Sequence, residues 1–117
     1  MKVLLVEDET DLLSLVSEAL DHYGVAVTEA ESGGKALEAL GRGDQFDVLV
    51  SDIAMPGNLS GIDVAYEVLK AYPDMRIILT SGHPLSNFSP LPENTHFLPK
   101  PYRVKQLMDL LNRHSAT

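Results

Sequence analysis

The stretch Val3-Leu4-Leu5-Val6-Glu7-Asp8-Glu9 opens the chain with a short apolar run that ends abruptly in three acids. A continuous apolar run without alternation is typical of a strand buried on both faces, as in a parallel sheet. Three further apolar runs are each followed closely by a polar group: VLV (48–50) by Asp52, IIL (77–79) by Thr80, and the weaker FL (97–98) by Lys100. Because the carboxyl ends of parallel strands meet at one edge of a sheet, we expect these groups to converge on one cleft.

Helical spacing alternates with strand-like runs along the rest of the chain. The pattern predicts strands at 2–7, 25–30, 46–51, 75–80 and 95–98, and helices at 10–23, from an N-cap at Ser32 to about Gly41, at 62–72, and from Val104 to Leu111. Strands that alternate with helices through short connections predict an α/β fold. The expected architecture is a doubly wound, five-stranded parallel sheet with helices on both faces.

One segment interrupts this alternation. Residues 83–94 (HPLSNFSPLPEN) contain three prolines and show no helical periodicity. Proline removes a backbone donor and disrupts a helix interior. The fourth helix, expected between the fourth and fifth strands, is therefore predicted to be short or degraded, with at most one turn at 85–89.

Composition limits the class of protein. A chain of 117 residues without cysteine predicts one domain, residues 1–117, and fits a reducing compartment. A net charge of −8 argues against direct nucleic-acid binding, which depends on basic side chains. The apolar runs are far shorter than the roughly 20 residues that span a bilayer. The first run leads directly into acids and does not resemble a signal peptide, so we expect a cytoplasmic domain without membrane contact.

The acids suggest a metal site. Glu7, Asp8 and Asp52 supply the oxygen ligands that Mg²⁺ prefers. Any one acid is explained equally well by the start of a helix, where a carboxylate interacts favourably with the dipole, but Asp52 follows a strand and caps no helix. An aspartate beside a cation is also a chemically sensible nucleophile toward phosphorus, and Lys100 and Thr80 are suited to stabilise a phosphoryl group.

Four stretches in register along essentially the whole chain resemble the receiver domain of two-component response regulators. They are VLLVEDE (3–9), FDVLVSDIAMPGNLSGID (46–63), ILTSGH (78–83) and FLPKPY (97–102). The resemblance implies a flavodoxin-like sheet of strand order 2-1-3-4-5. It also implies a cytoplasmic phosphoprotein of a His-Asp phosphorelay, whose partner is a histidine kinase or a histidine phosphotransfer domain. It also implies no enzyme activity beyond the domain's own phosphorylation and slow dephosphorylation.

The resemblance implies a role for each matching acid. Asp52 would accept the phosphoryl group as an aspartyl phosphate and would also be a ligand of Mg²⁺. Asp8 would bind the metal directly and Glu7 through water, while the backbone carbonyl of Ala54 would supply a further ligand.

It also implies a switch. The hydroxyl of Thr80 would contact the phosphoryl group, and Lys100 would pair with Asp52 before phosphorylation and with the phosphoryl group afterwards. Phe97 matches the position whose aromatic ring turns inward when the threonine moves. Packing of a partly buried aromatic explains Phe97 equally well.

The chain departs from the usual pattern in three places. The loop MPGNLSG places Gly61 nine residues after Asp52, a longer form that looks like receivers fused to hybrid sensor histidine kinases. The degraded fourth helix belongs to the family's usual dimer face, so at most a weak homodimer is expected. Ala54 and Gly82 flank the phosphoacceptor without side chains able to orient a water molecule, which predicts slow self-dephosphorylation.

Two other functions compete with this interpretation. A Mg²⁺-dependent phosphatase with an aspartyl nucleophile also needs a lysine and a hydroxyl, but it is expected to carry a general acid at position 54, where this chain has alanine. A non-phosphorylated pseudo-receiver, acting only as a binding module, predicts loss of the acids or the lysine, and all of them are present.

Overall fold

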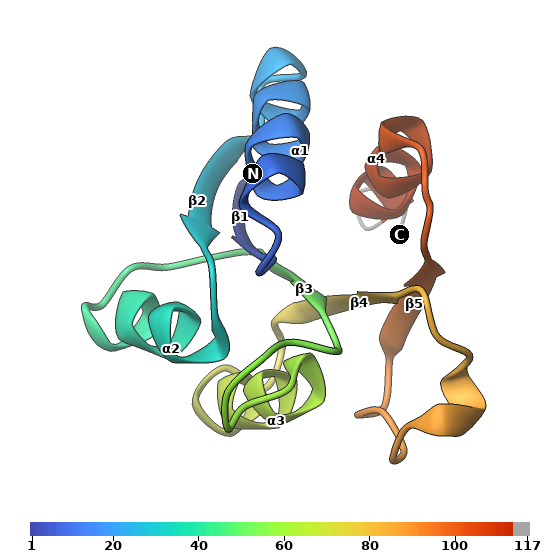
Figure 1. The fold of residues 1–117 in the computed structure, drawn as a ribbon. Helices are drawn as coiled ribbons and strands as arrows, with labels where there is room; N and C mark the ends of the chain where they lie inside the picture. The colour runs from blue at the N-terminus through green and yellow to red at the C-terminus, as the bar shows by residue number, and fades with distance from the viewer. Residues whose placement is uncertain (114–117) are drawn as a thin grey trace.

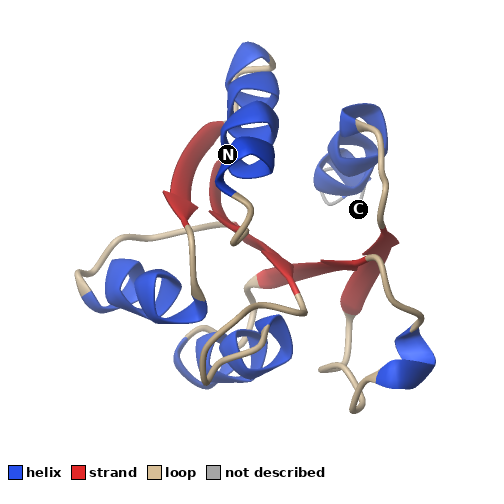
Figure 2. Cartoon of the chain, viewed as in Figure 1, coloured by secondary structure: helices blue, strands red, loops and turns tan. Residues whose placement is uncertain are grey.

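The computed structural model describes residues 1–113 as alternating strands and helices (Figures 1 and 2). The elements are β1 (Lys2–Val6), α1 (Thr10–His22), β2 (Ala26–Ala30), α2 (Gly33–Gly41), β3 (Val48–Asp52), α3 (Gly61–Ala71), β4 (Arg76–Ser81), the 3₁₀ turn η1 (Leu85–Asn87), β5 (Thr95–Pro99) and α4 (Val104–Arg113). In this part of the chain, every helix is too short or too polar to traverse a bilayer.

The five strands form one parallel sheet in the order β2-β1-β3-β4-β5. Helices α1 and α4 cover one face of this sheet, and α2 and α3 cover the other (Figure 1). The predicted doubly wound α/β architecture and its strand order are therefore confirmed. Because every strand runs in the same direction, all five carboxyl ends lie along one edge.

Two hydrophobic cores sandwich the sheet, because successive strand residues point to opposite faces. The α2/α3 core contains Leu4, Val6, Leu49, Ile77 and Leu79 of the strands, with Ala36, Ala39, Val64, Ala65 and Val68 of the helices. The α1/α4 core contains Val3, Leu5, Val48, Val50 and Ile78 of the strands, with Leu13, Val16, Leu20, Leu107 and Leu111 of the helices. Burial of both faces explains why the strands read as continuous apolar runs rather than as alternating ones.

Two strands extend further than their apolar residues indicate. The third strand was predicted to end at residue 51 and the fourth at residue 80, but β3 ends at Asp52 and β4 at Ser81, and Asp52 pairs with Thr80 in the ladder. The backbone N–H of Ile53 then donates to the carbonyl of Thr80 at 2.9 Å. Apolar side chains indicate burial, whereas the ladder depends on backbone groups, so the sequence pattern ended each of these strands one residue early.

Side-chain caps determine where two helices begin. The Ser32 hydroxyl accepts a hydrogen bond from the Lys35 N–H at 3.1 Å, which confirms the predicted N-cap of α2. Ser60 and Asp63 form a reciprocal capping box at the start of α3. This box fixes the point at which the chain re-enters a helix after the long loop that follows β3.

The segment between β4 and β5 contains only η1, so the prediction of a degraded fourth helix is confirmed for the described chain. Phe88 and Leu91 of this segment pack against the α2/α3 core. The hydroxyl of Tyr66 on α3 donates to the carbonyl of Pro90 at 2.9 Å. The segment therefore covers this side of the core without a helix.

Candidate functional site

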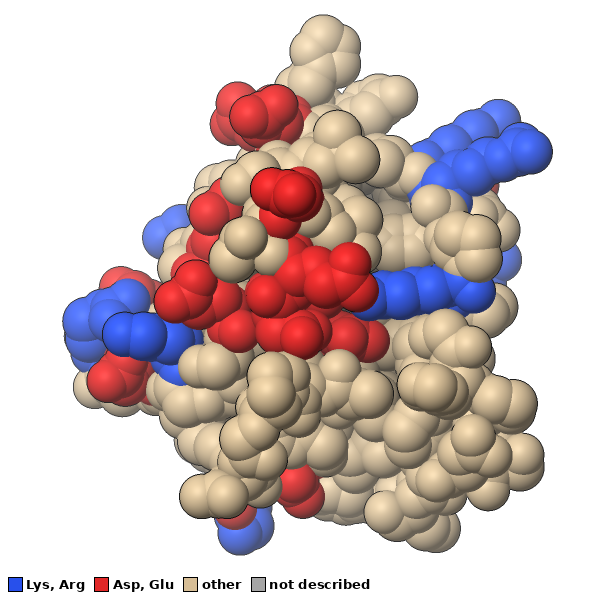
Figure 3. All heavy atoms as spheres, viewed as in Figure 1, with Lys and Arg blue, Asp and Glu red and all other residues tan. Residues whose placement is uncertain are grey.

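The carboxyl edge of the sheet brings three acids together. Oxygen atoms of Glu7, Asp8 and Asp52 all lie within 4.8 Å of one another. Glu7 and Asp8 directly follow β1, which pairs with β3, the strand that ends at Asp52. Glu7 is 4% exposed and Asp52 is 7% exposed, so these carboxylates are removed from bulk water. Figure 3 shows acidic side chains gathered in the middle of this face.

Lys100 reaches the acids from the far end of the sequence. Its ammonium Nζ donates to Glu7 Oε1 at 2.6 Å and lies 3.5 Å from Asp52 Oδ1. The backbone N–H of Lys100 donates to the carbonyl of Ser81 at 2.8 Å, so the β4–β5 ladder positions the side chain at the edge. The Lys100–Pro101 peptide bond is cis. Lys100 was expected to pair with Asp52; it contacts both carboxylates and lies closer to Glu7.

The buried charges shift one another's pKa values. Burial raises the pKa of Asp52 to about 6; Lys100 opposes this rise, and Glu7 and Asp8 add to it. Burial alone would lower the pKa of Lys100, but the hydrogen bond to Glu7 and the charges of both carboxylates raise it overall. Lys100 therefore stays charged, and a single ammonium faces three carboxylates. This excess of negative charge favours binding of a cation.

The donor set fits a divalent ion such as Mg²⁺. The converging groups are carboxylate oxygens, which hard cations prefer, and they lie at an open strand edge rather than in a closed cage. Ala54 is exposed in the loop directly after this edge, and its carbonyl remains a predicted ligand.

Thr80 and Phe97 lie on the neighbouring strands. Thr80 is 3% exposed and lines, with Glu7 and Asp52, a small cavity beneath the acids. Phe97 is half-buried, packs against the α2/α3 core, and pairs with Leu79 in the β4–β5 ladder. The structure thus brings Thr80 into the site and places Phe97 one strand away, and the inward turn of its ring remains a prediction.

Gly61 supports the site in a way that the sequence pattern did not reveal. A Cβ atom built on Gly61 would lie 2.2 Å from the backbone oxygen of Asp52, which is far inside van der Waals contact. The N–H of Gly61 also donates to the carbonyl of Ile53 at 2.9 Å. The start of α3 is thus pressed against the backbone behind Asp52. The available signals were the place of Gly61 in the loop MPGNLSG, nine residues after Asp52, and its position directly after the N-cap Ser60, and neither indicates a close contact with the backbone.

Tyr102 was also missed. It lines the same small cavity as Glu7, Asp52 and Thr80. Burial raises the pKa of Tyr102, and the charges of Glu7 and Asp52 add to the rise while Lys100 opposes it. Its position two residues after Lys100 was the available signal, but an aromatic residue after a strand is usually explained by core packing.

Known proteins share this fold and sequence pattern. A sensor kinase CckA from Brucella abortus is 39% identical over 109 residues, which cover 90% of this chain but only 11% of that protein. A response regulator receiver protein from Sinorhizobium medicae has a TM-score of 0.86 at 32% identity, covering 97% of this chain and 92% of that one. Response regulator protein TrrA from Thermotoga maritima, solved in complex with Mg²⁺-BeF, has a TM-score of 0.84 at 29% identity, covering 96% of each chain.

The family model described as the response regulator receiver domain matches residues 3–112. The match covers β1 from Val3 onward, the other four strands, all three converging acids and Lys100. The chain therefore belongs to the response regulator receiver domain family of two-component systems.

Proposed function

We propose that this chain is a phosphoacceptor, in which Asp52 receives a phosphoryl group from a phosphohistidine on a histidine kinase or phosphotransfer protein, with Mg²⁺ bound at Glu7, Asp8 and Asp52. The observation that carries the proposal is the convergence of these acids with Lys100, whose ammonium contacts both Glu7 and Asp52. The Thermotoga maritima relative, solved with Mg²⁺-BeF, supports a cation at this position.

In the proposed step, a carboxylate oxygen of Asp52 attacks phosphorus. The new P–O bond forms as the P–N bond breaks, and the histidine ring, protonated on its other nitrogen, leaves as neutral imidazole. With a pKa of about 6, Asp52 is mostly ionised at pH 7 and is able to attack. Lys100 and the Thr80 hydroxyl then stabilise the transferred charge. A bound Mg²⁺ would neutralise negative charge on the carboxylates and the phosphoryl group.

The residues that flank Asp52 argue against a phosphatase. Hydrolysis of an aspartyl phosphate needs a group that orients water, and the exposed residues Ala54 and Gly82 have no such side chain. We therefore expect the phosphoryl group to persist, so that the domain acts as a signal carrier rather than as a turnover enzyme. The retained acids and lysine argue equally against a pseudo-receiver.

The phosphoryl group would shift an existing equilibrium between inactive and active conformations in the cytoplasm. Thr80, Phe97 and the segment between β4 and β5 are the groups proposed to respond. The similarity to sensor kinase CckA from Brucella abortus, and to the solved receiver domain of a hybrid histidine kinase CckA, favours a place in, or beside, a hybrid histidine kinase.

Labelling with a small phosphodonor tests the proposal. With acetyl phosphate and Mg²⁺, intact mass should show one phosphoryl group per chain, and chelation of Mg²⁺ should reduce the rate at least about 100-fold. Asp52→Asn should take no label and keep the wild-type circular dichroism spectrum. Asp74→Asn, which removes an exposed acid at the opposite edge, is the matched control and should label normally. Undiminished labelling of Asp52→Asn would reject the assignment, and many turnovers per chain would favour the phosphatase.

A further inference from the structure

Tyr102 connects the buried charges to the core of the domain. It lies two residues after Lys100, between β5 and α4, and packs against the α1/α4 core. It also lines the cavity beneath Glu7, Asp52 and Thr80. Core packing requires only the aromatic ring, so phenylalanine would serve equally well for that purpose. The hydroxyl is the part that needs a separate explanation.

The hydroxyl of Tyr102 is an uncommitted donor near the acids. Among residues 1–113 it has no hydrogen-bond partner, and it is not one of the fully buried unpaired side-chain atoms, so water reaches it and it remains free to donate to a protein acceptor. Burial raises the pKa of the Tyr102 phenol, the charge of Lys100 lowers it, and the charges of Glu7 and Asp52 raise it. These effects are consistent with a position close to the three groups.

Glu7 accepts two hydrogen bonds, and one of them depends on the position of Lys100. Its Oε1 accepts from Lys100 at 2.6 Å, and its Oε2 accepts from the N–H of Glu9 at 3.1 Å. When Lys100 moves toward a phosphoryl group on Asp52, Oε1 loses its donor. Glu7 is only 4% exposed, and a bound Mg²⁺ would be shared among three carboxylates, so a second donor to Glu7 would remain favourable.

We propose that the Tyr102 hydroxyl donates to Glu7 when Lys100 pairs with the phosphoryl group, so that Tyr102 is a positioning residue of the phosphorylated state. The inference rests on the proposed function. Tyr102 touches neither the donor histidine nor phosphorus; it acts by replacing the hydrogen bond that Lys100 gives up. The Tyr102 hydroxyl therefore stabilises Glu7 little while Lys100 remains bonded to Glu7, and much more once a phosphoryl group is present.

Beryllium fluoride, a mimic of the phosphoryl group, separates these two states. Tyr102→Phe keeps the ring and removes only the hydroxyl; Tyr72→Phe removes a half-buried hydroxyl far from the acids and is the matched control. We expect Tyr102→Phe to bind Mg²⁺ as the wild type does but to bind beryllium fluoride about tenfold more weakly, as loss of a hydrogen bond to a charged group predicts. Tyr72→Phe should match the wild type in both titrations.

A spectroscopic signal provides a readout independent of phosphorylation. The ¹³Cζ resonance that disappears in Tyr102→Phe belongs to Tyr102. In the wild type it should shift when beryllium fluoride is added to the Mg²⁺-saturated protein, and it should shift much less with Mg²⁺ alone. A purely structural tyrosine would instead lower the unfolding midpoint of Tyr102→Phe and leave the beryllium fluoride affinity unchanged.

The outcomes distinguish the two hypotheses. If the wild type binds beryllium fluoride and takes label, but Tyr102→Phe binds equally tightly and the resonance does not move, only the role of Tyr102 is overturned. If the wild type neither binds beryllium fluoride nor takes label, the proposed function is overturned, and the role of Tyr102 is overturned with it.

Discussion

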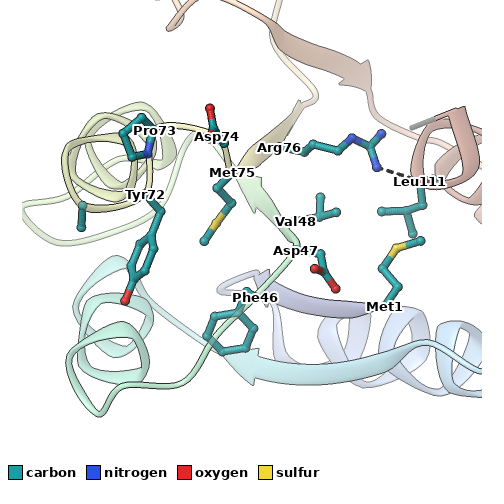
Figure 4. Close-up of a pocket in the computed structure, with 11 residues that line it drawn as sticks. Met1, Phe46, Asp47, Val48, Tyr72, Pro73, Asp74, Met75, Arg76 and Leu111 are labelled. Carbon is teal, nitrogen blue, oxygen red and sulfur yellow. Dashed lines mark hydrogen bonds between the residues drawn. The ribbon is translucent and has the colours of Figure 1, made fainter. Parts of the chain in front are cut away.

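The two edges of the sheet carry very different sites on the same strands. The amino edge has the larger hollow, about 590 Å³, which is lined by Met1, Phe46, Asp47, Val48, Ala71, Tyr72, Pro73, Asp74, Met75, Arg76 and Leu111 (Figure 4). The carboxyl edge has only a small cavity beneath Glu7 and Asp52. Judged by volume alone, the amino edge would be the binding site.

Each edge holds one partly buried cation, and the partners of that cation differ. At the amino edge, Arg76 donates to the backbone carbonyl of Leu111 at 2.9 Å and to that of Leu110, so it satisfies the last turn of α4 (Figure 4). At the carboxyl edge, Lys100 contacts two carboxylates. Neutral carbonyls satisfy the donors of Arg76 but offer no acidic cluster, whereas at the carboxyl edge three acids exceed the charge of one lysine. The cluster of acids, rather than cavity volume, identifies the reactive edge.

The largest effect is expected from Gly61→Ala, which places a methyl group against the backbone of Asp52. The added Cβ would lie 2.2 Å from the Asp52 backbone oxygen, so backbone must move. We expect a loss of about 3 kcal/mol in unfolding free energy, measured by urea denaturation, together with slower labelling. Gly41→Ala is the control, because its Cβ would meet nothing within 4 Å. A stability equal to that of Gly41→Ala would show that this close approach is not a constraint.

The second-largest effect is expected from Lys100→Met, which should slow labelling at the carboxyl edge. Lys100 lowers the pKa of Asp52, so its loss should raise that pKa above the present value of about 6. We expect labelling at pH 7 to fall about 10- to 100-fold, because less Asp52 is ionised and the transferred charge lacks a cation. The readouts are the labelling rate and the carboxyl ¹³C titration of Asp52. Arg76→Met removes a cation from the other edge. An equal effect of both variants on labelling would show that the carboxyl edge has no special role.

Asp52→Asn should stabilise the Mg²⁺-free protein at pH 7. The pKa of Asp52 is raised from 3.8 to about 6 in the folded state, so the folded protein binds this proton more tightly than the unfolded chain. The associated stability is fully present below the unfolded pKa and is lost as the pH rises through the folded pKa. Removing the charge should therefore gain about 1–3 kcal/mol at pH 7 and little below pH 4.

The measurement is denaturation of both proteins with a chelator at several pH values. Saturating Mg²⁺ should reduce the advantage of Asp52→Asn, because the ion binds the folded wild type. A constant difference at every pH would mean that burial of the Asp52 charge is not its cause.

The smallest effect is expected from Arg76→Met at the amino edge. Loss of its hydrogen bonds to the end of α4 should lower the unfolding free energy by about 1 kcal/mol. Labelling with acetyl phosphate should stay within twofold of the wild type. A strong loss of labelling would indicate that the two edges are coupled through α4.

Much of the fold follows from local patterns. The run at residues 3–6 is apolar at every position because both faces of the sheet are covered, and together with the alternation of strands and helices it predicted a parallel sheet. The prolines of residues 83–94 predicted the missing helix for an equally local reason. The ends of β3 and β4, at Asp52 and Ser81, were each placed one residue too early, because backbone pairing leaves no trace in side-chain polarity.

The sequence by itself determined the alternation of strands and helices and the edge at which the acids meet, because both depend on apolar runs and on the polarity of the residue that follows each run. Only the tertiary structure decided that Lys100 lies closer to Glu7 than to Asp52, that burial raises the pKa of Asp52 to about 6, that Gly61 packs against the backbone of Asp52, and that Tyr102 lines the cavity beside the acids. Glu7 and Lys100 are 93 residues apart in the chain. Distances of a few ångströms between such groups follow from how the two cores pack, and no local pattern records them.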